Sequence, residues 1–298
     1  MPFFTVIIPT YNRADLIGVA IQSVLHQTFC DYEIIIIDDA SKDNTQEVVS
    51  KFLDKRVHYI KNEVNLERSR TRNKAINMAK GSFITFLDSD DYYLENHLQN
   101  FYDEITSIKT ENVMIFCNKK MLENETISEV YFKPLTENPV EYFLLIPVMP
   151  LQVCVSKEVL LKYQFNPSIH INEDSLLWME IASEYPIHQS NKDTCVYLVH
   201  ENNSINVQKN NVFKNRLHSI KIALSNPIIS KNISAKKQQL AKSDCYFGMF
   251  NYYKYNQKKI QQIICIISAI VLFPQIKLKN KIHLLLSSLP VFSSFFKE

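Results

Sequence analysis

The chain has 298 residues, 46% of them hydrophobic, and a formal net charge of +2. This length can bury one large core or two smaller ones. Six cysteines lack both the pair spacing of a zinc site and the density of a disulfide scaffold, which favours the cytoplasm. Because Met1-Pro2-Phe3-Phe4 leads directly into an apolar run, we expect no secretory signal.

Apolar runs alternate with helix-like segments through the first 100 residues. The pattern predicts strands at 4–8, 33–37, 57–60 and 82–87, and helices at 15–27, 43–53 and 67–79. Such alternation is typical of βαβ units in an open, mostly parallel sheet flanked by helices. Right-handed crossovers place the carboxyl ends of parallel strands on one side, so the residues that follow these strands should meet.

Two predicted strands end abruptly in carboxylates. Phe83–Leu87 is followed by Asp88-Ser89-Asp90-Asp91, and four consecutive isoleucines are followed by Asp38 and Asp39. Carboxylates this close repel one another unless a cation or a hydrogen-bond network holds them ionised. Oxygen ligands without nearby Cys or His favour Mg²⁺ or Mn²⁺, which commonly take up substrate phosphates. The alternative is a solvated acidic turn that caps the helix beginning near Leu94.

Several motifs occur in order along this region. They are Thr5-Val6-Ile7-Ile8-Pro9-Thr10-Tyr11-Asn12-Arg13, Ser23-Val24-Leu25-His26-Gln27-Thr28, Ile37-Asp38-Asp39-Ala40-Ser41, Arg72-Asn73, Ala79-Lys80-Gly81 and Leu87-Asp88-Ser89-Asp90-Asp91. Together they resemble the inverting GT-A glycosyltransferases of family two, closely over residues 3–100 and more loosely to about 200. Two glycines usual in that family are replaced here by Ala40 and Glu67.

The resemblance implies a nucleotide-sugar site at the sheet edge. Its base pocket would be lined by Pro9, Thr10 and Tyr11, with Tyr11 stacked on a uracil or similar ring. Asp39 would accept a hydrogen bond from the base, and Arg72 would reach the nucleotide.

The resemblance also implies a metal site for Mn²⁺ or Mg²⁺. Asp88 would face the ribose or the metal, and Asp90 would be the direct ligand. His200 follows a strand-like run at 195–199 and precedes an Asn and Ser pair, where related transferases bring a histidine toward the metal or the pyrophosphate. A surface histidine is an equally good interpretation.

Glu173 and Asp174 begin an apolar helix in the second half of the chain. Acidic residues stabilise helix N-termini, so an ordinary cap is one interpretation. The resembled family carries its catalytic base in such a pair, which maps to Asp174, and an inverting transfer needs a carboxylate to take the acceptor proton. Glu173 and Trp178 are candidates for contacts with the acceptor, although a single helical tryptophan is more often a core residue.

The C-terminal region has a different composition. Residues 209–298 contain 15 Lys and Arg but only two acidic residues, which gives +13, whereas residues 1–208 carry −11. The pattern predicts helices at 212–224, 235–255, 258–273 and 278–289. Lysine dominates, only one arginine is present and no recognition motif occurs, so we expect no nucleic-acid partner.

The apolar run Ile263–Phe273 is shorter than the about 20 residues needed to span a bilayer. Basic and aromatic side chains border it, at Lys258, Lys259, Lys277, Lys279, Lys281, Phe292, Phe295 and Phe296. This arrangement favours an in-plane anchor on a peripheral membrane surface. A packed helical subdomain or an oligomer interface is the alternative.

The sequence therefore predicts an α/β protein of the GT-A type with a helical C-terminal region. Residues 1–110 would bind the nucleotide-sugar donor, 111–207 the acceptor, and 208–298 would form a basic tail on the inner face of the cell membrane. The expected reaction is inverting transfer of a sugar from a UDP-linked donor to a hydroxyl of a glycan or lipid-linked glycan, in surface polysaccharide synthesis. Alternatives are a polyprenyl-phosphate acceptor and a non-catalytic nucleotide-sugar-binding partner in a polysaccharide assembly.

Overall fold

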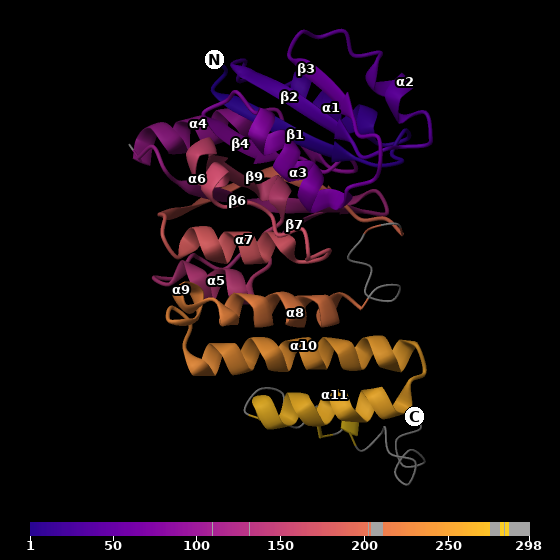
Figure 1. Cartoon of the computed structure of the whole chain (residues 1–298), viewed down its shortest axis with the longest axis vertical. Coiled ribbons are helices and arrows are strands. Elements are labelled where there is room, and N and C mark those ends of the chain that lie inside the picture. Colours follow the sequence, from indigo (N-terminus) through magenta and orange to yellow (C-terminus); the bar gives the residue numbers. More distant parts are fainter. Residues whose placement is uncertain are drawn as a thin grey trace. The chain divides into compact units, whose positions relative to one another are not determined.

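A computed structural model describes residues 1–108, 110–130, 132–201, 203, 211–274, 281–282 and 284–285 of the chain. It divides into two compact units, Met1–His200 and Glu201–Glu298. The strands lie in the first unit, and the described part of the second unit is helical (Figure 1).

One sheet forms the centre of the first unit. Its described strands are β1 (Phe4–Thr10), β2 (Tyr32–Asp38), β3 (Val57–Lys61), β4 (Phe83–Phe86), β5 (Tyr92–Tyr93), β6 (Met114–Glu123), β7 (Thr126–Val130), β8 (Val153–Ser156) and β9 (Ile187–Leu198). The order is β3-β2-β1-β4-β8-β6-β9-β5, with β7 paired to β6. The helices of this unit are α1 (Ile17–Leu25), α2 (Thr45–Val49), α3 (Glu67–Met78), α4 (His97–Ile108), α5 (Pro139–Leu145), α6 (Lys157–Lys162) and α7 (Glu173–Ala182).

The sheet is parallel in its first half and mixed beyond it. Strand β1 pairs in parallel with β2 and β4, and β2 pairs in parallel with β3. Strand β8 is antiparallel to both β4 and β6, whereas β6 and β9 are parallel. The predicted α/β fold is thus confirmed, with more antiparallel pairing than the sequence indicated. Because β1, β2 and β4 run the same way, their carboxyl ends share one edge.

The isoleucine run of β2 is apolar throughout because both faces of the strand are covered. Ile34 and Ile36 belong to one buried cluster with Ile17 and Ile21 of α1. Helix α3 also packs on β1 and β2, and every residue of β2 is buried. A strand buried on both faces shows continuous hydrophobicity rather than alternation.

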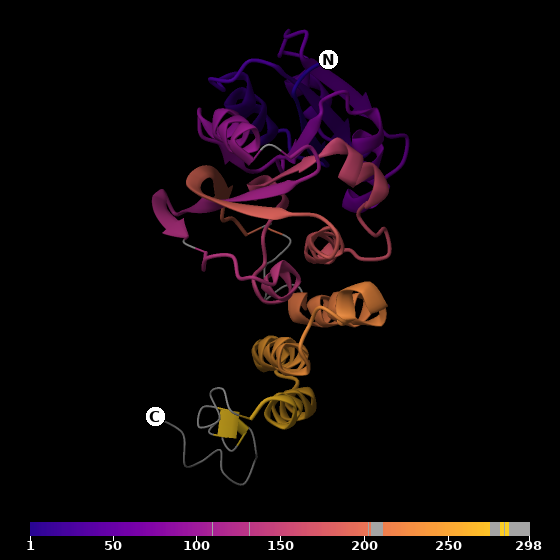
Figure 2. The ribbon, with the colours of Figure 1, turned by 90° about the vertical axis from the view of Figure 1, so that its left-hand side faces the viewer.

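The second unit contains α8 (Val212–Ser225), α9 (Pro227–Ser230), α10 (Ala235–Tyr255) and α11 (Lys259–Leu272). Figures 1 and 2 show α8, α10 and α11 side by side. Gly248 of α10 permits this packing, because a Cβ there would lie 2.2 Å from the ring of Phe213 on α8. The three predicted helices between 212 and 273 are therefore present, whereas most of the predicted helix at 278–289 lies outside the described residues. No helix in the described ranges is both long and apolar enough to cross a membrane.

Two residues that replace family glycines keep a glycine-like backbone. Ala40 and Glu67 each have φ of 67°, in the left-handed region. A side chain there costs roughly 1–2 kcal/mol, which glycine avoids. The fold has therefore retained the turns although the glycines are absent.

We predict that Ala40→Gly and Glu67→Gly each stabilise the first unit by about 0.5–1 kcal/mol. Relief of the left-handed strain should exceed the entropy that glycine adds to the unfolded chain. Chemical denaturation measures the change in unfolding free energy. Ala20→Gly, in the interior of helix α1, is the control and should destabilise the protein. Destabilisation at residues 40 and 67 would show that their side chains contribute more than the strain costs.

Candidate active site

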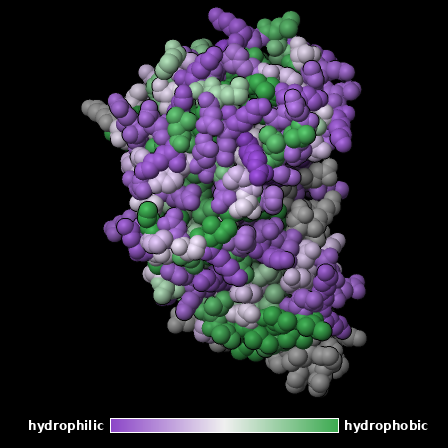
Figure 3. Space-filling view, in the orientation of Figure 1, coloured by the Kyte–Doolittle hydropathy of each residue, from purple (hydrophilic) through white to green (hydrophobic). Residues whose placement is uncertain are grey.

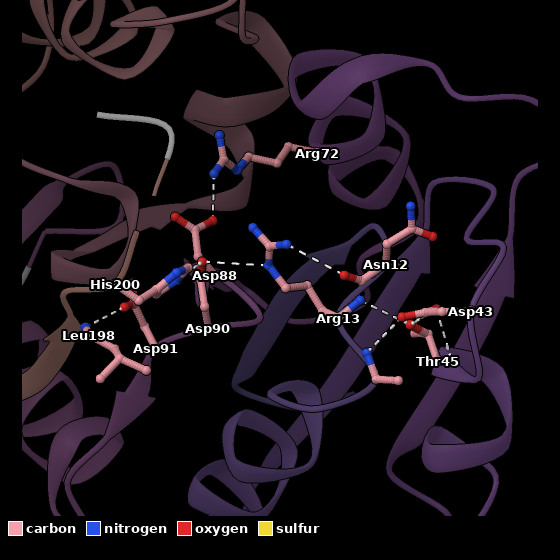
Figure 4. Close-up of polar contacts among 11 residues, drawn as sticks. Asn12, Arg13, Asp43, Thr45, Arg72, Asp88, Asp90, Asp91, Leu198 and His200 are labelled. Carbon is pink, nitrogen blue, oxygen red and sulfur yellow. Dashed lines mark hydrogen bonds and ion pairs between the residues drawn. The ribbon is translucent and has the colours of Figure 1, made fainter. Parts of the chain in front are cut away.

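The loops that follow β1 and β2 are fastened together at the shared strand edge. The backbone N–H of Asn12 donates to Ser41 Oγ at 2.8 Å, and that of Arg13 donates to Thr45 Oγ1 at 3.1 Å. The N–H of Ala14 donates to Asp43 Oδ2 at 3.0 Å (Figure 4). These bonds fix the loop that carries Tyr11, whose side chain is exposed at this edge of the sheet.

The paired carboxylates after β2 have different partners. Asp38 is fully buried and accepts hydrogen bonds from Tyr59 Oη at 2.5 Å and the N–H of Ser41 at 2.7 Å. Asp39 Oδ1 accepts from Asn62 Nδ2 at 2.9 Å and from the N–H of Leu66 at 2.8 Å. Asp38 therefore shapes the loop, whereas Asp39 holds the start of α3 through Oδ1.

Two further residues predicted for the base pocket lie at the end of β1. Pro9 is half-buried and pairs with Ile37 of β2. Thr10 is buried, and its Oγ1 has no hydrogen-bond partner within the described residues. Its backbone carbonyl accepts the N–H of Asp39 at 2.8 Å. A buried hydroxyl without a protein partner is a group that a bound ligand can satisfy.

Arg72 of α3 joins the two halves of the first unit. Its Nη2 lies 2.6 Å from Asp88 Oδ1, and its Nη1 lies 2.9 Å from Glu173 Oε1. Burial alone would lower the pKa of Arg72, but the carboxylates of Asp88 and Glu173 outweigh it and raise that pKa. The guanidinium is therefore a fixed positive charge between the turn after β4 and the start of α7.

The Arg72-Asn73 motif also fixes the segment that precedes α7. Asn73 Nδ2 donates to the Phe165 carbonyl at 2.8 Å, and the N–H of Phe165 donates to Asn73 Oδ1 at 3.0 Å. The Arg72 guanidinium lies 5.2 Å from the centroid of the Phe165 ring. Both residues thus bind the same segment. Asn73 bonds its backbone through a side-chain amide, and Arg72 makes a cation–π contact with the Phe165 ring.

The three carboxylates after β4 point to three different partners (Figure 4). Asp88 contacts Arg72, as above. Asp90 Oδ2 lies 3.0 Å from His200 Nε2 and 3.6 Å from Arg13 Nε. Asp91 is buried and accepts the N–H of Leu198 at 2.9 Å. Burial, with the charges of Asp88 and Asp90, raises the pKa of Asp91 well above its ordinary value.

The donor chemistry beside Asp90 fits a divalent ion in part. Asp90 and His200 converge from the turn after β4 and the end of β9, and the nearby Asp88 carboxylate is partly exposed. The described residues contain no group of three or more His, Cys, Asp or Glu that could hold an ion by themselves. Asp90 and His200 thus offer two converging side chains, and an ion held there would need water and substrate phosphate to complete its coordination.

Asp174 lies at the first turn of α7, beside the Arg72 bridge. Burial and the negative charge of Glu173 raise the pKa of Asp174 to about 7, although the N–H of Ser175 bonds its carboxylate. A carboxylate with this pKa can exchange a proton near neutral pH. Asp174 is thus suited to act as a base.

The two predicted acceptor contacts have structural partners instead. Trp178 is fully buried, its Nε1 donates to the Val148 carbonyl at 2.9 Å, and its ring packs near Phe86 and Phe165. The prediction of a sugar platform at Trp178 was wrong, and the core interpretation holds. Glu173 is also buried and is bound to Arg72, so it positions the guanidinium rather than contacting an acceptor.

Sequence reasoning missed Lys119 of β6. It is buried, its Nζ lies 2.8 Å from Met149 Sδ and 5.3 Å from the centroid of the Tyr197 ring. Burial lowers the pKa of Lys119, while the charges of Cys195, Asp91 and Asp174 oppose that shift. A lysine that continues the apolar run 113–117 was the available signal for a buried cation.

Comparison with known proteins identifies a family. Residues 5–154 match the model described as glycosyl transferase family 2. The chain is 32% identical over 184 residues to the Escherichia coli UDP-Glc:alpha-D-GlcNAc-diphosphoundecaprenol beta-1,3-glucosyltransferase WfgD. The matched residues make up 60% of this chain and 70% of WfgD. Two other curated relatives are matched over about half of their own length, 53% and 48%.

Solved structures share the fold. S. aureus TarS 1–349 in complex with UDP-GlcNAc has a TM-score of 0.66 over 96% of this chain and 84% of TarS, at 20% identity. The mannosyltransferase PcManGT from Pyrobaculum calidifontis in complex with GDP-Man and Mn²⁺ has a TM-score of 0.62 over 92% of this chain and 88% of PcManGT, at 17% identity. At this identity the likeness establishes the GT-A architecture.

We predict that Arg72→Met destabilises the first unit by about 3–5 kcal/mol, because Glu173 then becomes an unpaired buried carboxylate. Adding Glu173→Gln should recover a large part of that loss, since it removes the unpaired charge. Unfolding free energies of the two single variants and the double variant measure the coupling. Additive effects of the two substitutions would contradict the bridge.

Proposed function

This chain belongs to glycosyl transferase family 2, and on that premise we propose that it transfers a sugar from a UDP-linked donor to an acceptor hydroxyl with inversion. One observation carries the proposal. The buried Arg72 guanidinium contacts both Asp88, in the expected donor site, and Glu173, the neighbour of the candidate base. This double contact supports a single site for the donor and acceptor chemistry.

The proposed donor pocket lies at the ends of β1 and β2. The exposed ring of Tyr11 offers a surface for stacking on the base, and Asp39 Oδ2 offers an acceptor for the base N–H. The unpartnered hydroxyl of Thr10 supports a polar ligand atom there. A UDP-sugar is the favoured donor because the name of the relative WfgD specifies UDP-Glc.

In the proposed reaction the acceptor oxygen attacks the anomeric carbon as the bond from that carbon to the diphosphate breaks. The acceptor proton passes to the Asp174 carboxylate, and the electron pair of the broken bond leaves with the nucleotide diphosphate. Attack from the face opposite the leaving group inverts the anomeric carbon. The pKa of about 7 supports Asp174 in this role, because part of it is ionised at neutral pH yet it accepts a proton readily.

We propose that Asp90, Asp88 and His200 would hold Mn²⁺ or Mg²⁺, which would supply positive charge to the departing diphosphate. Asp91 has a positioning role in this arrangement. Its bond to the N–H of Leu198 fixes the end of β9, two residues before His200. The cations of Arg13, in the loop after β1, and of Arg72, in α3, approach the same acidic turn.

We propose a glycan or lipid-linked glycan as acceptor, in surface polysaccharide synthesis at the inner face of the cell membrane. The name of WfgD specifies a diphosphoundecaprenol-linked acceptor, which supports the lipid-linked form. Transfer to a polyprenyl phosphate is less suited to this site, because that acceptor is already an anion and needs no base such as Asp174.

A donor screen tests the proposal. Purified protein is incubated with UDP-, GDP- and dTDP-sugars, Mn²⁺ and a lipid-linked glycan, and release of nucleotide diphosphate is measured. A UDP-sugar should give the fastest release that depends on acceptor. Binding of UDP-sugars without turnover on any acceptor would favour the non-catalytic alternative. The anomeric configuration of the product is a separate check, because retention would contradict inversion.

We predict that Asp174→Asn leaves UDP-sugar affinity unchanged and lowers turnover by roughly 10²- to 10⁴-fold. In the unsubstituted enzyme, turnover should rise with pH through about 7 and then level, because the base acts only when ionised. Below that pKa, each unit of pH should cost about tenfold in rate. A pH–rate profile with calorimetric UDP-sugar binding tests both, and an equal loss of donor affinity would assign Asp174 a structural role.

We predict that chelation abolishes transfer and that added Mn²⁺ restores it. Asp90→Asn should lose activity and keep its thermal stability, because the Asp90 side chain is partly exposed and its ion-pair partners within the described residues are only His200 and Arg13. Turnover after dialysis against EDTA is the measurement. Ser41→Ala, away from the acidic turn, should still respond to Mn²⁺ as the parent does. Full activity in EDTA would refute the metal proposal.

A further inference from the structure

The outer face of α11 is apolar although it is exposed. Ile260, Ile264, Ile267 and Val271 recur at i, i+4, i+7 and i+11, and their side chains are between 44% and 74% exposed. The opposite face of the helix, with Cys265, Ile266 and Ala269, is buried. A helix that is apolar on all sides is normally enclosed. The apolar patch over α11 is visible in Figure 3.

A groove of about 440 Å³ adjoins this apolar stripe, and both share Ile264. Helices α8, α10 and α11 supply its principal side chains, which are Lys214, His218, Lys221, Tyr246, Tyr253 and Ile264. The first three recur at i, i+4 and i+7 along α8, so they project from one face of that helix. No salt bridge in the described residues involves any of these three. The groove therefore combines unpaired basic groups with an aliphatic wall.

The second unit has a large excess of basic residues, and two of them lie where they disfavour a helix. Residues 211–274 contain ten Lys and Arg but only one acidic residue, Asp244. Lys258 is the N-cap of α11 and Lys259 its first residue, and no acidic residue lies in that first turn. The helix dipole disfavours cations at an N-terminus. The two lysines at this N-terminus favour an anionic partner outside the unit.

We propose that the second unit binds the surface of a bilayer that contains anionic phospholipid. The α11 stripe enters the acyl boundary, and Lys214, His218 and Lys221 receive a lipid phosphate in the groove. Charge complementarity favours this occupant over a second copy of the chain, because pairing two copies through α11 would bring together two strongly basic units. The inference deepens the peripheral location in the proposed function, on which it rests, and it identifies the partner surface.

Vesicle flotation tests the role of the groove. The full chain is mixed with phosphatidylcholine vesicles, with or without phosphatidylglycerol, at low and high salt. Binding should require phosphatidylglycerol and weaken at high salt, because screening reduces the lysine contribution. Lys214→Gln/Lys221→Gln should weaken binding by about 10- to 30-fold. The control Lys231→Gln/Lys236→Gln removes the same charge from exposed positions outside the groove, and it should weaken binding several-fold less.

A second pair of variants tests the stripe. Ile260→Gln/Val271→Gln should abolish flotation, whereas Ile127→Gln/Leu161→Gln, which changes exposed apolar residues of the first unit, should not. Circular dichroism confirms that each variant is folded. The proposal is overturned if the parent ignores anionic vesicles, if both lysine pairs lose equally, or if the stripe variant floats normally. It is also overturned if that variant only converts a dimer to a monomer in light scattering.

Nucleotide release from a UDP-sugar onto a detergent-solubilised lipid-linked glycan is measured for every variant. Variants of the groove and the stripe should retain this activity, because their substitutions lie outside the first unit. Vesicle binding by an inactive parent would refute the proposed function and leave the membrane inference intact. Activity without vesicle binding would refute the membrane inference and leave the proposed function intact.

Discussion

A single buried guanidinium connects the parts of this site. Arg72 contacts Asp88 on one side and Glu173 on the other, so the turn after β4 and the first turn of α7 cannot move apart without exposing an unpaired charge. The position of Arg72 is set in turn by Asp39, which accepts the N–H of Leu66 immediately before α3. A chain of contacts thus runs from the end of β2, through α3, to the candidate base.

The same contacts explain why acidic pairs at strand ends are divided in function. Asp38 accepts hydrogen bonds from Tyr59 and Ser41, which shape the loop, whereas Asp39 accepts from Asn62 and Leu66 at the start of α3. After β4, Asp91 is held by the N–H of Leu198, while Asp90 faces His200. In each pair the more buried carboxylate fixes a loop or a strand end, and its neighbour is the one proposed to contact the donor or the metal. Asp91 is buried where it fixes the strand end that leads to His200, and this burial raises its pKa.

The sequence predicted the parallel half of the fold well because its signals are local. The isoleucine run of β2 and the boundaries of α10, at Ala235 and Tyr255, follow from periodicity and turn residues alone. Antiparallel pairing of β8 with β4 and β6 was not predicted, because it depends on partners about 40 to 70 residues away. For the same reason Trp178 was ambiguous. Its packing against Phe86 and Phe165 is a long-range contact with no signal in helical spacing.

Site residues show the same division between local and distant causes. Motif spacing placed Asp88, Asp90 and Asp174 at strand and helix ends, where the structure has them. It did not predict that Glu173 would serve Arg72, because that ion pair joins residues 101 positions apart. Lys119 was missed because a lysine in a strand is normally interpreted as a solvent-facing residue. Its burial between Met149 and Tyr197 becomes evident only when β6, β9 and the segment before β8 are assembled.

The charge balance of the assembled site limits what it can bind. The candidate site contains the carboxylates of Asp39, Asp88, Asp90, Glu173 and Asp174. Its cations are Arg13, Arg72 and Lys119, and Arg72 already contacts two of the carboxylates. A diphosphate brings further negative charge into this region, and like charges at short range repel strongly where water is scarce. Stable binding of such a donor therefore requires positive charge beyond these side chains or protonation of a carboxylate. Asp91, whose pKa is raised well above its ordinary value by burial and by the charges of Asp88 and Asp90, already supplies a neutral carboxyl in this turn, and a divalent ion would supply the remaining positive charge.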